Sequence, residues 1–201
     1  ITKLTGASGA ELEEMQNIAK EMGTRVPADF DTIATAVGEV NTRFGITGDE
    51  LDSVSEKFVK FSELNGVDIT TAVDQVQKSM AAFGLSVEDT SEVLDILTRV
   101  SQNTGISVDR LTNGLVTNSL AFQEMGLDIN QASTLMGMLE KSGVRMETVT
   151  NGLRKALKNA SDDGIDVNTA LADLQDTIAN STDETTRSEE RRVGKEGRSR
   201  W

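Results

Sequence analysis

The sequence predicts an all-α fold, an array of about nine short helices packed as hairpins, with no sheet. Three observations support this prediction. A short sequence motif, called the recurrent word below, consists of glycine, an apolar residue and a capping residue. It recurs along the chain every 17 to 21 residues. Between these words, apolar residues recur in steps of three and four, which is the spacing of one helix face. The chain has one proline and no convincing run of alternating polar and apolar residues, so no strand is predicted.

Each recurrent word predicts that one helix ends and the next begins. In Gly105-Ile106-Ser107, the glycine can adopt the left-handed conformation that ends a helix. Ser107 can then accept a hydrogen bond from a free amide in the next first turn. Other copies begin at Gly66, Gly84, Gly126 and Gly164, and weaker ones at Gly45 and Gly143. The apolar residue of the word is expected to pack on the side chain of a residue in the new helix. The expected pairs are Ile46 with Leu51, Ile106 with Leu111 and Val144 with Val149.

The opening segment, residues 1–26, is interpreted as one helix and a linker of a truncated chain, because the sequence begins with Ile1 rather than Met. Residues 5–9 (TGASG) are expected to be a flexible opening, with Ser8 capping a helix that Gly23 ends. Val26-Pro27 is expected to start the following helix, because proline is tolerated in a first turn.

Residues 27–180 are expected to hold the other helices. Each is predicted to span about 13 to 18 residues, or about 20 to 27 Å. Because the corners are short, neighbouring helices must pack back on one another. The expected buried stripes, in chain order from the first helix, are Leu12, Met15, Ala19 and Met22; Phe30, Ile33, Val37, Val40 and Phe44; Leu51, Val54, Phe58, Phe61 and Leu64; Ile69, Ala72, Val73, Val76, Met80 and Phe83; Val93, Leu94, Ile96, Leu97 and Val100; Val108, Leu111, Leu115, Phe122 and Met125; Ile129, Ala132, Leu135, Met136 and Leu139; Met146, Val149, Leu153, Ala156 and Leu157; and Val167, Ala170, Leu171, Leu174 and Ile178.

Residues 181–201 break the pattern and are expected to be a disordered or non-native tail. Residues 187–201 resemble the translation of a common sequencing-adapter oligonucleotide, with Gly197 where that translation has Cys. We therefore exclude them from functional reasoning. The alternative interpretation is a natural basic tail for an acidic partner, since six of the 20 basic residues lie there.

Composition excludes several classes of chemistry. Cysteine and histidine are both absent, which removes thiol nucleophiles, histidine bases and the usual zinc or haem ligands. The net charge of −13 argues against binding to a phosphate backbone. No run approaches the roughly 18 to 20 apolar residues that cross a bilayer. We therefore expect no cofactor, no nucleic-acid binding and no membrane span in this segment.

A calcium loop is the best metal candidate, at residues 161–164 (SDDG) with Asp166. If Gly164 is the sixth residue of an EF-hand loop, Asn159, Ser161 and Asp163 occupy ligand positions. The twelfth residue is then Ala170, so the closing carboxylate is missing. A helix cap and turn is the better interpretation, and no metal ligand is predicted.

No catalytic residue is predicted either. Residues 6–9 (GASG) follow no strand and lack the Lys-Ser/Thr sequel of a phosphate loop. The carboxylate pairs Glu13-Glu14, Asp49-Glu50 and Asp162-Asp163 have the residue type of acid–base catalysts. With 33 acids in the chain, pairs arise by chance, and acids in a first turn suit the helix dipole. We interpret these carboxylates as solvated or capping groups.

Methionines and mid-helix glycines have two interpretations each. Met125, Met136, Met138 and Met146 cluster in the sequence, and either fill the core or form an adaptable binding face; core filling is favoured. The glycines at 114, 137 and 152 fall inside helices, where each costs about 1 kcal/mol relative to alanine. Close approach of another helix, or a kink, is the expected reason.

Several longer words resemble the conserved region of phage tail tape measure proteins of the TP901 type. They are residues 34–51 (ATAVGEVNTRFGITGDEL), 100–111 (VSQNTGISVDRL) and parts of 121–157. The resemblance covers about Leu4 to Ala160. It implies a structural virion protein, largely helical, that lies in the tail lumen, sets the tube's length and leaves on DNA delivery. It also implies tail tube and tail assembly proteins as partners, self-association, and the host cytoplasm as the place of assembly.

Resemblance and residues together leave three functional hypotheses. The first is a tape measure segment without catalytic residues. The second is a non-viral helical-repeat module that binds proteins. The third is an enzyme, such as a glycosidase with two carboxylates. Under the first, one continuous helix of 201 residues would span about 300 Å. The predicted corners would fold it back, so we expect a compact or rearrangeable helical domain rather than the extended ruler.

Overall fold

The computed structural model confirms the all-α prediction. It describes residues 1–174, 176 and 177, and none of these residues is in a strand. Residues 167–174, 176 and 177 are helical and belong to the last predicted helix, but its Ile178 and the predicted tail 181–201 lie outside the described residues. The other helices are α1 (Thr2–Thr5), α2 (Gly9–Arg25), α3 (Phe30–Phe44), α4 (Gly48–Asn65), α5 (Ile69–Ala82), the 3-10 turn η1 (Val87–Asp89), α6 (Thr90–Thr104), α7 (Val108–Glu124), α8 (Ile129–Lys141) and α9 (Met146–Asp162).

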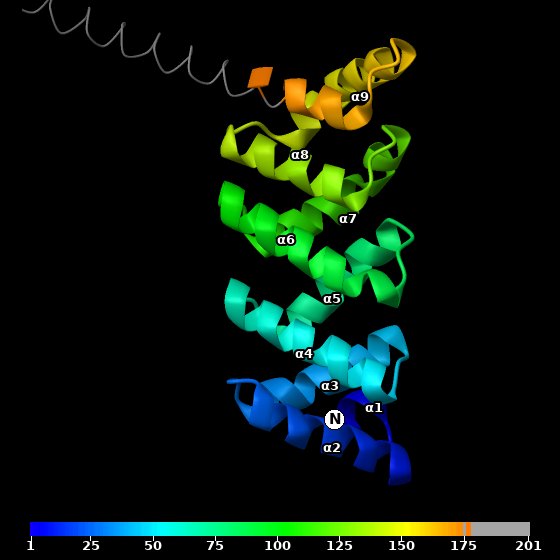
Figure 1. Ribbon diagram of the computed structural model, residues 1–201, viewed down its shortest axis with the longest axis vertical. Helices are drawn as coiled ribbons and strands as arrows, with labels where there is room; N and C mark the ends of the chain where they lie inside the picture. The colour runs from blue at the N-terminus through cyan, green and yellow to red at the C-terminus, as the bar shows by residue number, and fades with distance from the viewer. Residues whose placement is uncertain (175, 178–201) are drawn as a thin grey trace, which may run out of the picture.

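The helices stack in two rows, and the layers follow chain order along the long axis (Figure 1). From α2 to α8 each helix packs on the next one, and from α1 to α9 each packs on the next but one. The even helices α2 to α8 therefore form an even row, and the odd helices α1 to α9 form an odd row. The hairpin prediction is confirmed, but the outcome is an elongated stack of two-helix layers rather than a globule.

The predicted corners are confirmed at every glycine of the recurrent word. Gly45, Gly66, Gly84, Gly105, Gly126, Gly143 and Gly164 all have φ between 63° and 79°. Side chains of Asp68, Ser107 and Asp128 accept the expected amide hydrogen bonds. At Ser86 a turn of 3-10 helix intervenes before α6, and at Thr47 the side chain makes no cap bond.

The N-terminal segment differs from its prediction in three ways: its opening is ordered, Ser8 makes no side-chain cap bond, and Gly23 does not end α2. Residues 2–5 form α1, Gly6 ends it with φ 68°, and Ala7 is buried, so the opening is ordered. Gly23 does not end α2, which continues to Arg25, where the guanidinium binds Asp52 on α4. A helical glycine only lowers stability, and this tertiary contact outweighs it.

Pro27 does not start α3, which corrects a further prediction. Asp29 caps α3 instead, accepting from the Thr32 amide at 2.8 Å and the Thr32 hydroxyl at 2.6 Å. Val26 is extended, as expected for a residue that precedes proline. The Thr32 hydroxyl, and then its amide, hold the pKa of Asp29 below its ordinary value. A side-chain cap thus sets this helix start three residues later than predicted.

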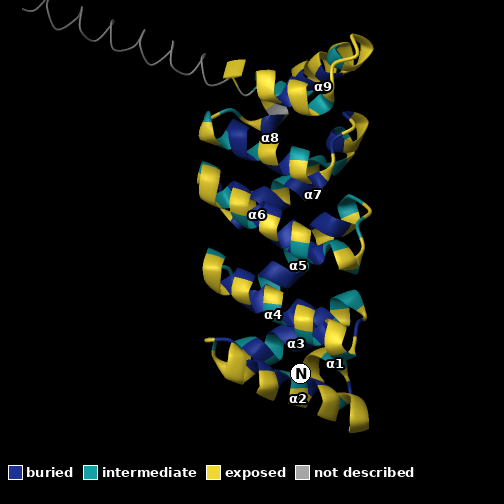
Figure 2. Cartoon of the chain, in the orientation of Figure 1, coloured by how far each residue is buried: buried dark blue, intermediate teal, exposed yellow. Residues whose placement is uncertain are grey.

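One hydrophobic core runs through the whole stack (Figure 2). The six residues of the three expected corner pairs are buried or pack against this core. The stripes were wrong at three positions: Phe30 is 54% exposed, Leu64 is 65% exposed, and Ala156 is also exposed. Phe30 is the first residue of α3, and Leu64 lies in the last turn of α4, where it lines a hollow between α4 and α6 that leaves it open to solvent.

The cap at Asp128 allows a first test. Its carboxylate accepts from the Gln131 amide at 2.8 Å, and Gln131 closes the capping box. We expect Asp128→Ala to lower the free energy of unfolding by about 1 kcal/mol, measured by urea titration. The matched control is Thr47→Ala, because Thr47 is also an exposed cap residue but makes no cap bond. Equal losses in the two variants would contradict the role of the carboxylate.

Candidate functional site

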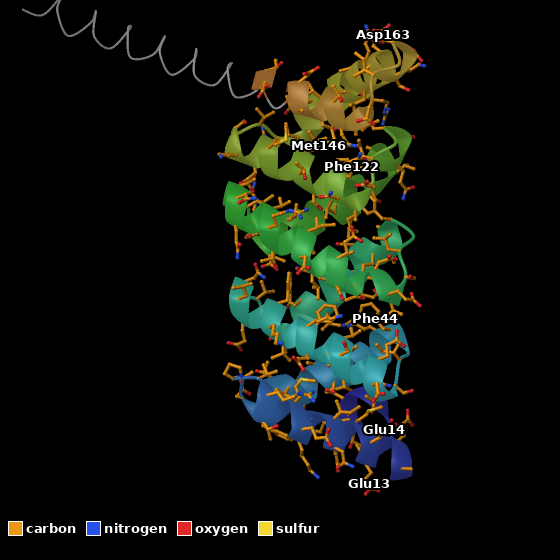
Figure 3. The ribbon with its side chains drawn as sticks, in the orientation of Figure 1. Glu13, Glu14, Phe44, Phe122, Met146 and Asp163 are labelled. Carbon is orange, nitrogen blue, oxygen red and sulfur yellow. The ribbon has the colours of Figure 1, made fainter. Side chains whose placement is uncertain are left out.

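The carboxylate pairs considered as catalysts fall into two groups, because Glu13, Glu14 and Asp49 line one hollow between α2 and the start of α4, whereas Asp162 and Asp163 lie elsewhere. Glu13 and Glu14 are on α2, at the opposite end of the stack from Asp163 (Figure 3). Asp162 forms an ion pair with Lys158 within α9. Asp166 accepts from the amides of Asn168 and Thr169, which confirms that it caps the next helix. Among the described residues, no three acidic side chains converge as metal ligands would.

Hydrogen bonds and ion pairs that join helices of successive layers, called polar ties below, are the feature that recurs. In the even row, Arg25 binds Asp52 through two bonds of 2.6 and 2.8 Å. Arg99 donates to Asn130 at 2.9 Å. The row's other ties join Lys57 to Ser91, Asn65 to Thr98 and Gln131 to Asn168. These ties join each even helix to the next even helix, so they fix the register between layers.

The odd row has ties of the same kind. Thr112 donates to Gln75 at 3.0 Å, between α7 and α5. Gln123 donates to the carbonyl of Ala82 at 2.5 Å, between the same helices. Across the two rows the tied residues lie 27 to 41 residues apart, which is about one two-helix layer. Further odd-row ties are the ion pairs of Arg154 with Glu124 and of Arg43 with Asp74, and the hydrogen bond that Thr42 donates to the carbonyl of Leu4.

Arg43 is the centre of a polar network that includes a buried carboxylate. Its Nε lies 2.8 Å from Glu39, and its Nη1 lies 2.7 Å from Asp74 on α5. Asp74 also pairs with Lys78. Glu39 is 6% exposed, so its charge depends on this partner. The spacing of Glu39 and Arg43 is a sequence signal for this pair, whereas nothing in the sequence indicates Asp74.

Removing the guanidinium tests this network. We expect Arg43→Met to lower the free energy of unfolding by about 1 to 2 kcal/mol, because Glu39 would lose its partner; the value is reduced because Arg43 is partly exposed. The control is Lys60→Met, which breaks the exposed pair with Glu56 and should cost less than about 0.5 kcal/mol. Thermal or urea unfolding measures both, and equal small effects would contradict the network's role.

The other candidate residues have structural roles. Met125, Met138 and Met146 are buried, which confirms core filling, and Met136 is half-buried against Gly114. Close approach is confirmed at Gly114 and Gly137. The prediction of close approach is wrong at Gly152, where a Cβ would meet no atom within 4 Å.

A close approach that the sequence analysis missed lies at Gly38. A Cβ there would lie 3.0 Å from Leu4 on α1. This contact holds α1 at the beginning of the odd row.

Comparison with known proteins gives the family. A model of phage-related minor tail proteins matches residues 16–190. The chain belongs to this family. The tail protein is also 21% identical over 158 residues to the tape measure protein of Pneumococcus phage Dp-1. That alignment covers 78% of the tail protein and 14% of the relative, so the chain spans only a small part of the relative's length. No solved structure matches the tail protein.

Family membership gives the tail protein a structural role in the phage tail. The resemblance to phage tail tape measure proteins is confirmed, and the non-viral alternative is not supported. The family is one of tail components rather than enzymes. Within the described part of the chain, no helix has both the length and the apolarity of a membrane span.

Proposed function

We propose that the chain is a segment of a tape measure protein. Such a protein would set the length of the tail tube during assembly in the host cytoplasm and would leave the tail lumen on DNA delivery. The family match over residues 16–190, with the similarity to a phage tape measure protein, carries this proposal. Tail tube and tail assembly proteins would be its partners. The excess of acidic residues would repel the phosphate backbone of DNA, so we expect no direct contact between this segment and DNA.

We also propose that this segment stays folded as a stack while it contributes to length. Each layer ends at corners with left-handed glycines, which a straight helix would have to remove. Residues 67–105 form one two-helix unit, α5 with α6. As one straight helix its 39 residues would span about 58 Å. As a layer in the stack they add only about 10 Å, the distance between packed helices.

An in-frame deletion of residues 67–105 tests both statements in a phage that encodes the chain. The new junction joins Gly66 to Ile106, so α4 still leads into α7 through a glycine corner. We expect tails about 10 Å shorter, measured by electron microscopy of many particles. A duplication of the same residues should lengthen the tails equally.

Three outcomes would contradict the proposal. A shortening of about 58 Å would show an extended segment. An unchanged length in both variants would show that the segment does not contribute to length. If the deletion yields no tails, circular dichroism of the purified variant chain distinguishes misfolding from a defect in assembly; a folded variant without tails contradicts a simple length change.

Absence of catalysis remains a prediction. The glycosidase hypothesis requires two carboxylates near one another. Glu13, Glu14 and Asp49 share a hollow between α2 and α4, so this is the place where the prediction needs a test, whereas Asp163 lies at the opposite end of the stack (Figure 3). If a preparation of the chain lyses cell walls, Glu13→Gln and Asp163→Asn should leave the activity unchanged. Loss of lysis in either variant would contradict our view that these carboxylates are solvated or capping groups. The division of the chain at residue 26 also remains a prediction.

A further inference from the structure

The outer face of α7 is uncharged. Residues 111–123 contain no charged residue, whereas 26% of the chain is charged. Asn113, Val116, Thr117 and Leu120 share this face at helical spacing, and Leu120 is 68% exposed. A large exposed apolar side chain among uncharged residues is typical of the centre of an interface, from which charged residues are depleted.

A hollow lies beside this face, between α7 and α8. Gly114, Met136 and Leu139 are among the residues that line it. Gly114 leaves the side of α7 open there, and the end of the Met136 side chain packs against it. The same helix therefore carries a projecting apolar side chain, Leu120, and borders a hollow whose lining combines apolar side chains with polar ones, among them Arg110 and Glu140.

The face is self-complementary in charge. Arg110 and Glu124 lie seven residues before and after Thr117. If two α7 helices cross in opposite directions at Thr117, Arg110 of each copy lies opposite Glu124 of the other. The side chains of Arg110 and Glu124 are 65% and 47% exposed, so both can contact a second copy without a change in the backbone of α7.

We propose that a second copy of this chain docks on the outer face of α7 through antiparallel pairing of the two α7 helices. The two-fold axis passes near Thr117 and runs along the long axis of the stack. This axis reverses the direction of α7 but keeps the direction of the stack, so the two copies lie side by side with their N-terminal layers at the same end. The proposal goes beyond the proposed function, since it concerns the isolated chain.

Sedimentation of the full chain at increasing concentration is the first test. We expect a monomer–dimer equilibrium that Leu120→Glu weakens at least about tenfold. The matched control is Leu64→Glu on α4, because Leu64 is 65% exposed but lies in the even row. Circular dichroism verifies that both variants fold. A chain that stays monomeric, or an equal effect of the two variants, overturns the proposal.

Charge exchange identifies the partners across the interface. Arg110→Glu alone and Glu124→Arg alone should each weaken the dimer, because like charges then meet in both contacts. A mixture of the two variant chains should form a heterodimer, since each contact again joins opposite charges. Loss of the intrachain pairs with Glu140 and Arg154 cannot produce this recovery on mixing. No recovery overturns the antiparallel register.

A cross-link locates the axis. The chain contains no cysteine, so a single introduced thiol reports one position. Thr117→Cys should form a covalent dimer with a short bismaleimide, and Thr134→Cys, exposed on α8, should not. Cross-linking at Cys introduced at 134 but not at 117 overturns the proposal. None of these measurements involves tails, so their failure leaves the proposed function untouched.

Discussion

Phe58→Ala is expected to lower the free energy of unfolding by about 3 to 5 kcal/mol, the largest effect of any substitution proposed for this protein. Phe58 is 0% exposed, and its ring lies 5.8 Å from that of Phe44. Its helix, α4, packs against α2, α3, α5 and α6, and Phe58 is part of the core that runs through these helices. A typical domain has only about 5 to 15 kcal/mol of stability, so the variant should be close to unfolding.

Urea unfolding followed by circular dichroism measures this effect. The control is Leu64→Ala in the same helix, which should change stability by less than about 0.5 kcal/mol because Leu64 is 65% exposed. Phe122→Ala should resemble Phe58→Ala, since Phe122 is also 0% exposed and stacks on Phe83. A loss below about 1 kcal/mol for both phenylalanines would show that the core is much looser than described.

Gly137→Val is the second substitution with a large expected effect. A Cβ at Gly137 would lie 2.7 Å from Cγ1 of Val100 and 2.8 Å from Cγ2 of Thr104, both on α6. These two neighbours are β-branched and have little rotamer freedom, so α6 and α8 would have to move apart. We expect a loss of about 2 to 3 kcal/mol from overpacking, measured as a lower midpoint in thermal or urea unfolding.

Gly152→Val is the matched control for this substitution. Gly152 also lies inside a helix, but a Cβ there meets no atom within 4 Å. The change should stay within about 0.5 kcal/mol of zero, because valine is a slightly better helix former than glycine. If Gly152→Val destabilises as much as Gly137→Val, the close approach of α6 to Gly137 does not explain the loss.

Local signals predicted the helices well because each corner carries its own chemistry. A glycine at the end of one helix and an Asp or Ser at the start of the next need no distant contact to act, so Gly105 and Ser107 were read correctly. Gly23 and Pro27 misled for the opposite reason. Gly23 is compatible with a helix end, but α2 continues to Arg25, which binds Asp52. Pro27 is compatible with a helix start, but α3 starts after Asp29, which accepts from the Thr32 amide.

The arrangement of the helices could not be read from the same signals. Short corners predict hairpins, but whether hairpins form a globule or a row depends on which faces meet. The contacts between layers, such as the ties of Arg43 to Asp74 and of Arg99 to Asn130, join residues 31 positions apart with no pattern between them. The face of α7 was also missed, because Leu120 breaks no helical rule; only its exposure distinguishes it.

In the described part of the chain, the main packing contacts join adjacent and next-but-one helices, so the stack is quasi-one-dimensional. Its contact order is low, so no layer needs a distant part of the chain in order to form. A steady pull on the two termini would detach layers one at a time, starting from an end where a helix has fewest neighbours. Each detached layer would release a length of chain several times the thickness of the layer in the stack, so the distance between the termini could increase stepwise under load.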